Sequence, residues 1–230
     1  MENKTETRIL PKYMILIYLS VPVFSIIYLG TQFMNSSLNF KQYLMFTSLM
    51  AVVITGGYQL FFWVQRNNYF FKTRCLKIKL DDKIPFWPSW IWIYNFIYYI
   101  MMGYVIVSIS SIEEGVNLIF AGLVLLSFQA IIFMFYPCTV PPSWRKYKVN
   151  SLSTRYLKFV QGIDNGRNCM PSMHCSVATL IGLILLPTLS YFAYGFIALI
   201  ALSCLFVKQH QILDLVPGIL LGWFVFVLIL

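Results

Sequence analysis

Charged side chains are scarce in this sequence, and acidic ones are the rarest. Only 11% of the 230 residues are charged, with 8 Asp and Glu against 17 Lys and Arg. Soluble domains carry about a quarter charged residues. Hydrophobic residues make up 59% of the chain and aromatic residues 18%. This balance excludes an ordinary soluble domain and predicts an all-α, multi-pass membrane protein.

Histidine and cysteine are too few, or too irregularly spaced, for most metal sites. Five cysteines, an odd number, follow no metal-ligand spacing, so neither a disulfide framework nor a metal or cofactor is predicted. The only histidines are His174 and His210. Together with Asp214 they match a two-histidine, one-carboxylate iron site, but membrane iron oxygenases generally need more histidines. The chain also lacks internal repeats and low-complexity linkers, and we predict no nucleic-acid or protein partner.

Long apolar runs are present instead, and they predict seven membrane spans. A helix needs about 20 residues to cross a hydrocarbon core of roughly 30 Å. The predicted spans are 13–31, 42–64, 84–110, 116–135, 171 to about 187, 191–207 and 212–230. Glu113 and Glu114 are expected to form a tight turn between the third and fourth spans.

A short polar island at residues 203–218 separates the last two spans. It contains Lys208, His210 and Asp214. His210 and Asp214 are four residues apart and share one face if the segment is helical, so the carboxylate can hold one ring nitrogen and leave the other free. This pattern predicts a histidine that acts as nucleophile or base. Lys208 also fits an ordinary cationic anchor at the membrane boundary.

The second histidine belongs to another polar motif, Pro171-Ser172-Met173-His174, at the start of the fifth span. With seven spans, this motif and the polar island face the same compartment, so they can meet. Each residue alone also has a structural explanation, because a histidine often caps a helix and a first-turn aspartate suits the helix dipole. The coincidence of both histidines at one side favours function.

A basic segment, residues 138–170, precedes the second motif. Its cations are Arg145, Lys146, Lys148, Arg155, Lys158 and Arg167, and aromatic residues lie between them. One interpretation is an amphipathic helix on anionic lipid head groups. The other is phosphate binding. The sequence leaves both open.

The two motifs in this order resemble the type 2 phosphatidic acid phosphatase superfamily of membrane lipid phosphatases and phosphotransferases. The shared pattern is Pro-Ser-x-His, a helical hairpin, and His-x-x-x-Asp followed four residues later by Gly218. The resemblance covers roughly residues 84–222. Ile84-Pro85-Phe86, the prolines from 137 to 142, and Lys208-Gln209-His210 are more similar to the inositolphosphotransferase-like branch.

The resemblance implies a six-helix phosphatase core with one extra N-terminal transmembrane helix. We therefore divide the chain into an N-terminal hairpin with its basic connection, 1–83, and a catalytic transmembrane core, 84–230. It also implies metal-independent phosphoryl transfer. His210 would attack the phosphate, Asp214 would orient and stabilise its ring, and His174 would protonate the leaving oxygen. Ser172 and the first amides of the fifth span would donate to the phosphate oxygens.

Hydrolysis of a phosphomonoester or diphosphate lipid is the activity expected first, with water as acceptor. Transfer of a phosphorylated head group to a lipid or polyol hydroxyl is the second expectation. A lipid transporter or lipid-binding protein, with the polar island as a gate, is the alternative of a different class. The expected partners are therefore a lipid phosphate and membrane lipids.

Three positions depart from the family pattern. Phe133, Val140 and Cys204 stand where the family usually carries a lysine, an arginine and another arginine. The phosphate-binding cations must then come from elsewhere. We expect Lys208, Arg167, Arg145 and Lys146 to replace them, in that order.

The location of the site across the membrane has two conflicting indications. Every Lys and Arg except Lys41 lies on the predicted site side. The positive-inside rule then places the site in the cytoplasm, whereas the resemblance implies an extracytoplasmic site. We predict a multi-pass protein of a bacterial cytoplasmic membrane and leave the side open.

Overall fold

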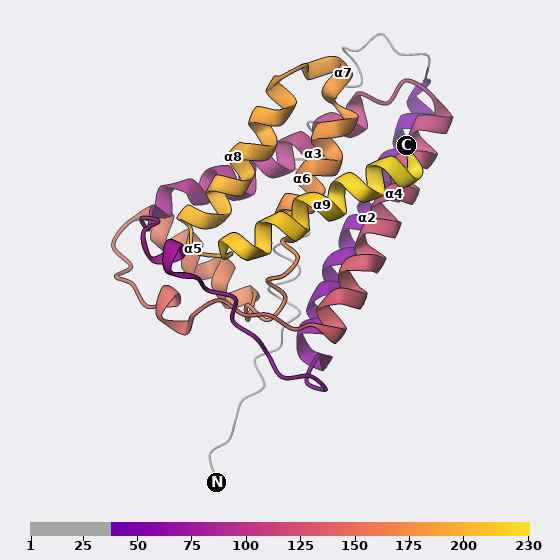
Figure 1. The fold of residues 1–230 in the computed structure, drawn as a ribbon. Helices are drawn as coiled ribbons and strands as arrows, with labels where there is room; N and C mark the ends of the chain where they lie inside the picture. Colours follow the sequence, from indigo (N-terminus) through magenta and orange to yellow (C-terminus); the bar gives the residue numbers. More distant parts are fainter. Residues whose placement is uncertain (1–37) are drawn as a thin grey trace, which may run out of the picture.

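The computed structural model describes residues 38–230, which form an all-α helical bundle (Figure 1). Within this range there are eight α-helices and no strands. They are α2 (Phe40–Asn67), α3 (Tyr98–Val107), α4 (Ile112–Phe135), α5 (Leu152–Ile163), α6 (Met173–Ile184), α7 (Leu186–Leu189), α8 (Phe192–Phe206) and α9 (Ile212–Ile229). The predicted fold class is confirmed. The predicted span 13–31 lies outside the described residues.

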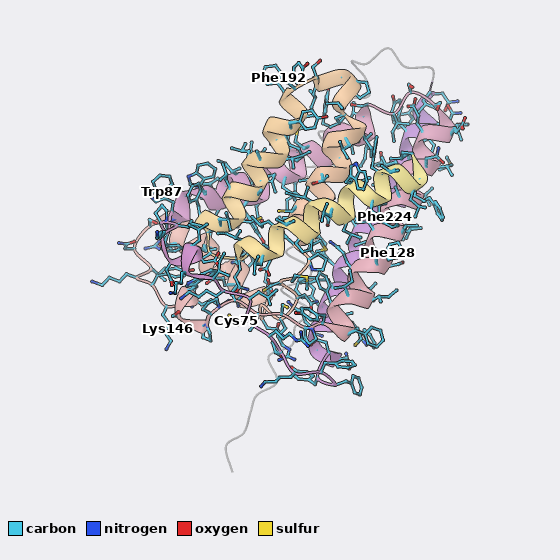
Figure 2. All side chains as sticks on the ribbon, in the orientation of Figure 1. Cys75, Trp87, Phe128, Lys146, Phe192 and Phe224 are labelled. Atoms are coloured by element: carbon cyan, nitrogen blue, oxygen red, sulfur yellow. The ribbon has the colours of Figure 1, made fainter. Side chains whose placement is uncertain are left out.

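Four helical stretches are long and apolar enough to cross a membrane: α2, Pro88–Val107, α4 and α9. Their outer surfaces expose large apolar side chains such as Val52, Phe120 and Leu220. Figure 2 shows Phe128 and Phe224 on this outer surface, where their rings meet edge to face 5.8 Å apart. Apolar surface on this scale needs lipid around it. The chain is an integral membrane protein.

The helices at the predicted fifth and sixth spans are shorter than a full crossing. With 12 residues in α6 and 15 in α8, their lengths are about 18 and 23 Å at 1.5 Å per residue. Pro187 explains where α6 ends, because proline offers no amide hydrogen to a continuing helix and instead lies in the first turn of α7. The turn from α7 to α8 passes through Ser190 at φ 49°.

Local capping sets the other boundaries. The Ser111 side chain accepts a hydrogen bond from the Glu114 amide, so α4 begins at Ile112. Glu113 and Glu114 are therefore in the first helical turn, where acidic side chains suit the helix dipole, and the expectation of a separate tight turn at these residues was wrong. In the basic segment, Ser151 and Thr154 cap α5, whose first turn follows directly.

The pair α6 and α9 is the most closely packed in the bundle. Gly218 and Gly222 of α9 lie directly against the backbone of α6. A Cβ added at Gly222 would stand 2.2 Å from the Ser176 carbonyl oxygen, and one at Gly218 would stand 2.6 Å from that of Ser172. The two helices approach this closely only because both positions lack a side chain.

Gly222→Ala is therefore expected to destabilise the bundle by about 1–3 kcal/mol, as overpacking of a close contact does. Thermal unfolding in detergent micelles should show a midpoint several degrees lower, with reduced folded yield. Gly195→Ala in α8 is the matched control, because a Cβ there meets nothing within 4 Å. Equal midpoints for the two variants would contradict the packing described for α6 and α9.

Three connecting segments cross the end of the bundle at which α9 begins. Short parallel bridges join Arg74 to Cys138 and Cys138 to Asn168. In Figure 2 the labelled side chains of Cys75, Trp87 and Lys146 lie at this end, and Phe192 lies at the opposite end. These segments enclose the turn that carries the polar island. The cytoplasmic and extracytoplasmic locations of this end both stay predictions.

Candidate active site

His210 and Asp214 lie together at the start of α9. His210 is in the turn between α8 and α9, and Asp214 is in the first turn of α9. His210 Nδ1 is 3.6 Å from Asp214 Oδ2, an ion-pair distance that is too long for a hydrogen bond. Both side chains are buried, and Asp214 is fully so. The geometry leaves Nε2 of His210 as the free ring nitrogen.

Asp214 also organises the surrounding backbone. Its Oδ2 accepts a hydrogen bond from the Gln211 amide at 2.8 Å, which caps α9. Its carbonyl oxygen accepts from the Ser172 amide at 2.9 Å, which ties the start of α6 to α9. The second carboxylate oxygen, Oδ1, is buried without a partner. One residue thus fixes the relative position of the two motifs.

His174 faces His210 from the start of α6. The two ring centroids are 6.3 Å apart, with an angle of 59° between the ring planes. The two rings therefore lie close to one another where α6 and α9 begin.

Two tyrosines hold the ring of His174. Tyr94 stacks on it with centroids 3.9 Å apart, and Tyr98 lies at 4.7 Å. Tyr94 belongs to a π-helical turn, Ile93–Ile97, directly before α3. Such turns occur often at functional sites. These tyrosines were not among the predicted site residues, although their spacing of four residues indicates a shared helix face.

The Asp214 carboxylate also sets the proton affinity of His210. Burial lowers the pKa of His210, because the imidazolium loses its water. The negative charge of the adjacent Asp214 carboxylate raises it by more, so the pKa of His210 lies above its ordinary value.

Lys208 is held by a residue that sequence analysis missed. Its Nζ donates to the Asp81 carbonyl oxygen at 2.8 Å and lies 4.7 Å from the Trp144 ring centroid. Its backbone φ is 56°, a conformation that costs a residue other than glycine about 1–2 kcal/mol. Burial lowers the pKa of its ammonium, and Asp81 and Asp82 oppose this effect. The Lys208 ammonium is therefore bound to the loop that carries Asp81.

Asp81 itself connects the basic loop to α9. It is fully buried, and its carboxylate accepts from the Ile78 amide at 2.8 Å and the Ile212 amide at 2.9 Å. Asp81 and Asp82 are two adjacent acidic residues within a basic run. This unusual pattern is the feature of the sequence that could have identified Asp81.

Arg145 lies over the loop that leads to His174. Its Nη1 donates to the Asp164 carbonyl oxygen at 2.7 Å, and its Nη2 is buried without a hydrogen-bond partner. Nη2 occupies the space of the missing side chain at Gly166, where φ is 75°. Nε2 of Gln161, another nitrogen donor, is also buried and unpartnered. Buried donors of this kind normally have acceptors, so this part of the site suits an anion.

The other predicted phosphate-binding residues are placed differently. Arg167 donates to the Asn68 side chain and carbonyl oxygen at 3.1 Å each and lies over the Tyr69 ring, so it ties the loop to the end of α2. Lys146 is exposed. Ser172 is fully buried and caps α6, where its Oγ accepts from the Cys175 amide at 3.3 Å.

The three positions that depart from the family pattern are all buried. Phe133, Val140 and Cys204 lie in the apolar interior with 2% exposure or less. Phe133 meets the Phe61 ring edge to face, 5.8 Å away. Neutral side chains suit these surroundings, where an unpaired charge would be costly.

Comparison with family models decides the family. Residues 62–228 match the model of the PAP2 superfamily. The protein belongs to the PAP2 superfamily. The matched region begins inside α2 and includes both histidine motifs. Comparison with curated proteins and with solved structures returned no match.

Membership implies a phosphatase-type activity, and PAP2 proteins are generally phosphatases that work without a metal. Within residues 38–230, no group of three or more His, Cys, Asp and Glu side chains is arranged to hold a metal ion.

Proposed function

We propose that this PAP2 protein hydrolyses lipid phosphates at the membrane surface through a phosphohistidine at His210. The observation that carries the proposal is the buried His210 and Asp214 pair, with His174 facing it 6.3 Å away. The proposed substrate class is a phosphomonoester or diphosphate lipid, because the site lies where apolar helices of an integral membrane protein begin.

The first step forms the phosphoenzyme. Nε2 of His210 attacks phosphorus, a P–N bond forms, and the bond from phosphorus to the leaving oxygen breaks. His174 gives its proton to that oxygen. Asp214 stabilises the positive charge that develops on the His210 ring.

The second step regenerates the enzyme. His174, now neutral, takes a proton from water as the water oxygen attacks phosphorus. The P–N bond breaks, inorganic phosphate leaves, and His210 returns to its starting form. The partnerless Arg145 Nη2 and Gln161 Nε2 support binding of the phosphate oxygens near this loop.

Transfer to a lipid or polyol hydroxyl is the second candidate. It is favoured by the buried neutral residues Val140 and Cys204 at positions where the family's phosphatases usually carry arginine. Phosphate release measured with and without added alcohols distinguishes the two, since transfer yields a new phosphate ester instead of inorganic phosphate. A transporter would release no phosphate at all.

Asp214→Asn is expected to shift the acidic limb of the pH profile to lower pH. Attack requires a neutral His210, so kcat/KM falls as pH drops through its pKa. The Asp214 carboxylate raises that pKa, and its loss leaves burial, which lowers it. The shift should appear in kcat/KM measured from acid to neutral pH. Asp82→Asn is the matched carboxylate control; an unshifted limb in Asp214→Asn would refute this role.

Arg145→Met is expected to raise KM for the lipid phosphate by roughly 10- to 150-fold, because a charge-assisted hydrogen bond is worth about 1.5–3 kcal/mol. The exposed neighbour Lys146 gives the matched control, Lys146→Met, for which we expect less than a twofold change. The measurement is steady-state phosphate release in mixed micelles. If the two variants behave alike, Arg145 does not bind the phosphate.

A further inference from the structure

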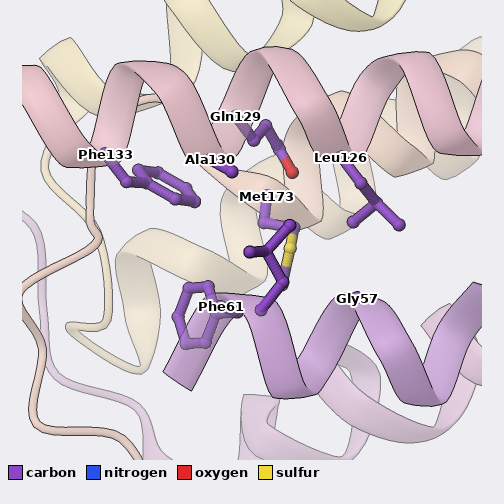
Figure 3. Close-up of a pocket in the computed structure, with 8 residues that line it drawn as sticks. Gly57, Phe61, Leu126, Gln129, Ala130, Phe133 and Met173 are labelled. Atoms are coloured by element: carbon purple, nitrogen blue, oxygen red, sulfur yellow. The ribbon is translucent and has the colours of Figure 1, made fainter. Parts of the chain in front are cut away.

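A recess between α2 and α4 lies within the membrane-spanning part of the bundle (Figure 3). Gly57 and Phe61 line it from α2, Leu126 and Gln129 from α4, and Met173 from the start of α6. Its empty volume of about 190 Å³ includes space open to the surroundings, and the enclosed part has room for about one water-sized group. Every lining side chain except Gln129 is apolar.

The amide orientation of Gln129 follows from its partner on α6. Nε2 of Gln129 donates to Ser176 Oγ. That hydroxyl has one proton, which it gives to the Met173 carbonyl oxygen at 3.0 Å. With that proton engaged, Ser176 Oγ accepts from Gln129, and in this arrangement the amide nitrogen faces Ser176 and the amide oxygen faces away.

The amide oxygen of Gln129 has no partner of its own. The side chain is 1% exposed, and Oε1 makes no hydrogen bond. In Figure 3 this oxygen is directed into the space between α4 and α2. An unsatisfied buried acceptor costs about 1–3 kcal/mol. A ligand that brings a hydrogen-bond donor into the recess would recover that energy.

The surroundings select the kind of donor. A buried water molecule needs two to four polar partners, and this recess offers one oxygen among apolar side chains. The ester carbonyls of diacyl phospholipids are acceptors and would face Oε1 with like partial charge. A hydroxyl at the end of an apolar chain brings one donor together with the apolar surface that the other lining residues require.

We propose that the recess binds the hydroxyl end of a long-chain lipid alcohol, whose O–H donates to Gln129 Oε1. The alkyl chain leaves between α2 and α4 into the bilayer. This is a second ligand, and its binding does not depend on the proposed hydrolysis.

One link to catalysis does rest on the proposed function. Ser176 is about 6 Å along α6 from Ser172, at 1.5 Å per residue. The bound hydroxyl therefore lies about one helical turn deeper than the phosphate site. A lipid alcohol is both the product of hydrolysing a lipid monophosphate and the acceptor required for transfer.

Photolabelling of the full chain in lipid nanodiscs tests the binding. The probes are a long-chain alcohol with a diazirine in its chain and the corresponding methyl ether, which lacks the donor. Both are used on wild type and on His210→Ala, so that a failure of catalysis does not affect the result. We expect the alcohol to label peptides of α2 and α4 about fivefold more than the ether, the equivalent of one neutral hydrogen bond.

Three further variants separate binding from folding. Gln129→Leu, similar in size and apolar, should abolish the preference for the alcohol. Ala130→Leu, which fills the recess and leaves Gln129 intact, should reduce labelling by the alcohol. Ile131→Val on the outer face of α4 should change nothing, because Ile131 points away, at 55% exposure. Equal labelling by both probes in wild type, or a preference that survives Gln129→Leu, would overturn the proposal.

Discussion

His210→Ala is expected to reduce phosphate release from a lipid phosphate by about 10⁴-fold or more, as removal of a nucleophile does in enzymes that form covalent intermediates. The loss should appear in kcat, because the variant retains the Arg145 region that we propose binds the phosphate. Phosphate release by detergent-solubilised protein measures it directly. His210→Gln, which keeps a polar side chain of similar length, should be equally inactive.

Folding is the required control for this result. Asp214 keeps its cap on the Gln211 amide in both variants, so the thermal midpoint should change little. Wild-type activity in a folded His210→Ala protein would sink the phosphohydrolase proposal and favour the transporter class.

His174→Ala is expected to lose about 10²–10⁴-fold in the phosphorylation step, the usual contribution of a general acid. The loss should depend on the leaving group. An alkyl alkoxide needs the proton from His174, whereas p-nitrophenolate does not. Single-turnover formation of the phosphoenzyme should therefore be impaired strongly with a lipid monoester and only slightly with p-nitrophenyl phosphate.

The opposite pattern would contradict the role of His174. An equal loss with both substrates indicates that the ring supports the site structurally, through its stacking with Tyr94 and Tyr98. Tyr94→Leu tests this support separately: it removes the stacking partner, leaves the acid in place, and should retain the difference between leaving groups.

The sequence was sufficient to predict the helical bundle and the meeting of the two histidine motifs. Long apolar runs predict membrane helices directly. His210 and Asp214 are only four residues apart, so their proximity can also be predicted from the sequence. Asp81 was beyond this reasoning, since its bond to the Ile212 amide joins residues 131 apart in the chain. The stacking of Tyr94 on His174 likewise depends on how the π-helical turn before α3 packs against the start of α6.

Lys208 shows that a position next to a site residue in the sequence does not fix what a side chain contacts in the fold. Its place beside His210 makes it a natural candidate for phosphate binding. In the folded chain its ammonium contacts the Asp81 carbonyl oxygen and the Trp144 ring, which come from two separate loops. Arg145 shows the reverse: it is distant in sequence, yet its guanidinium keeps a buried donor free near the loop before His174. In both cases long-range loop contacts, which the sequence does not display, set where the cation lies.

Trapping the phosphoenzyme is the most direct test of the proposed phosphohistidine at His210. The full chain is mixed with a lipid phosphate carrying ³²P, quenched within milliseconds in alkali, where phosphohistidine is stable, and mapped by mass spectrometry. We expect one acid-labile phosphate per chain on His210, absent in His210→Ala and accumulating in His174→Ala with an activated substrate. Turnover without any labelled enzyme, or label on another residue, would contradict it.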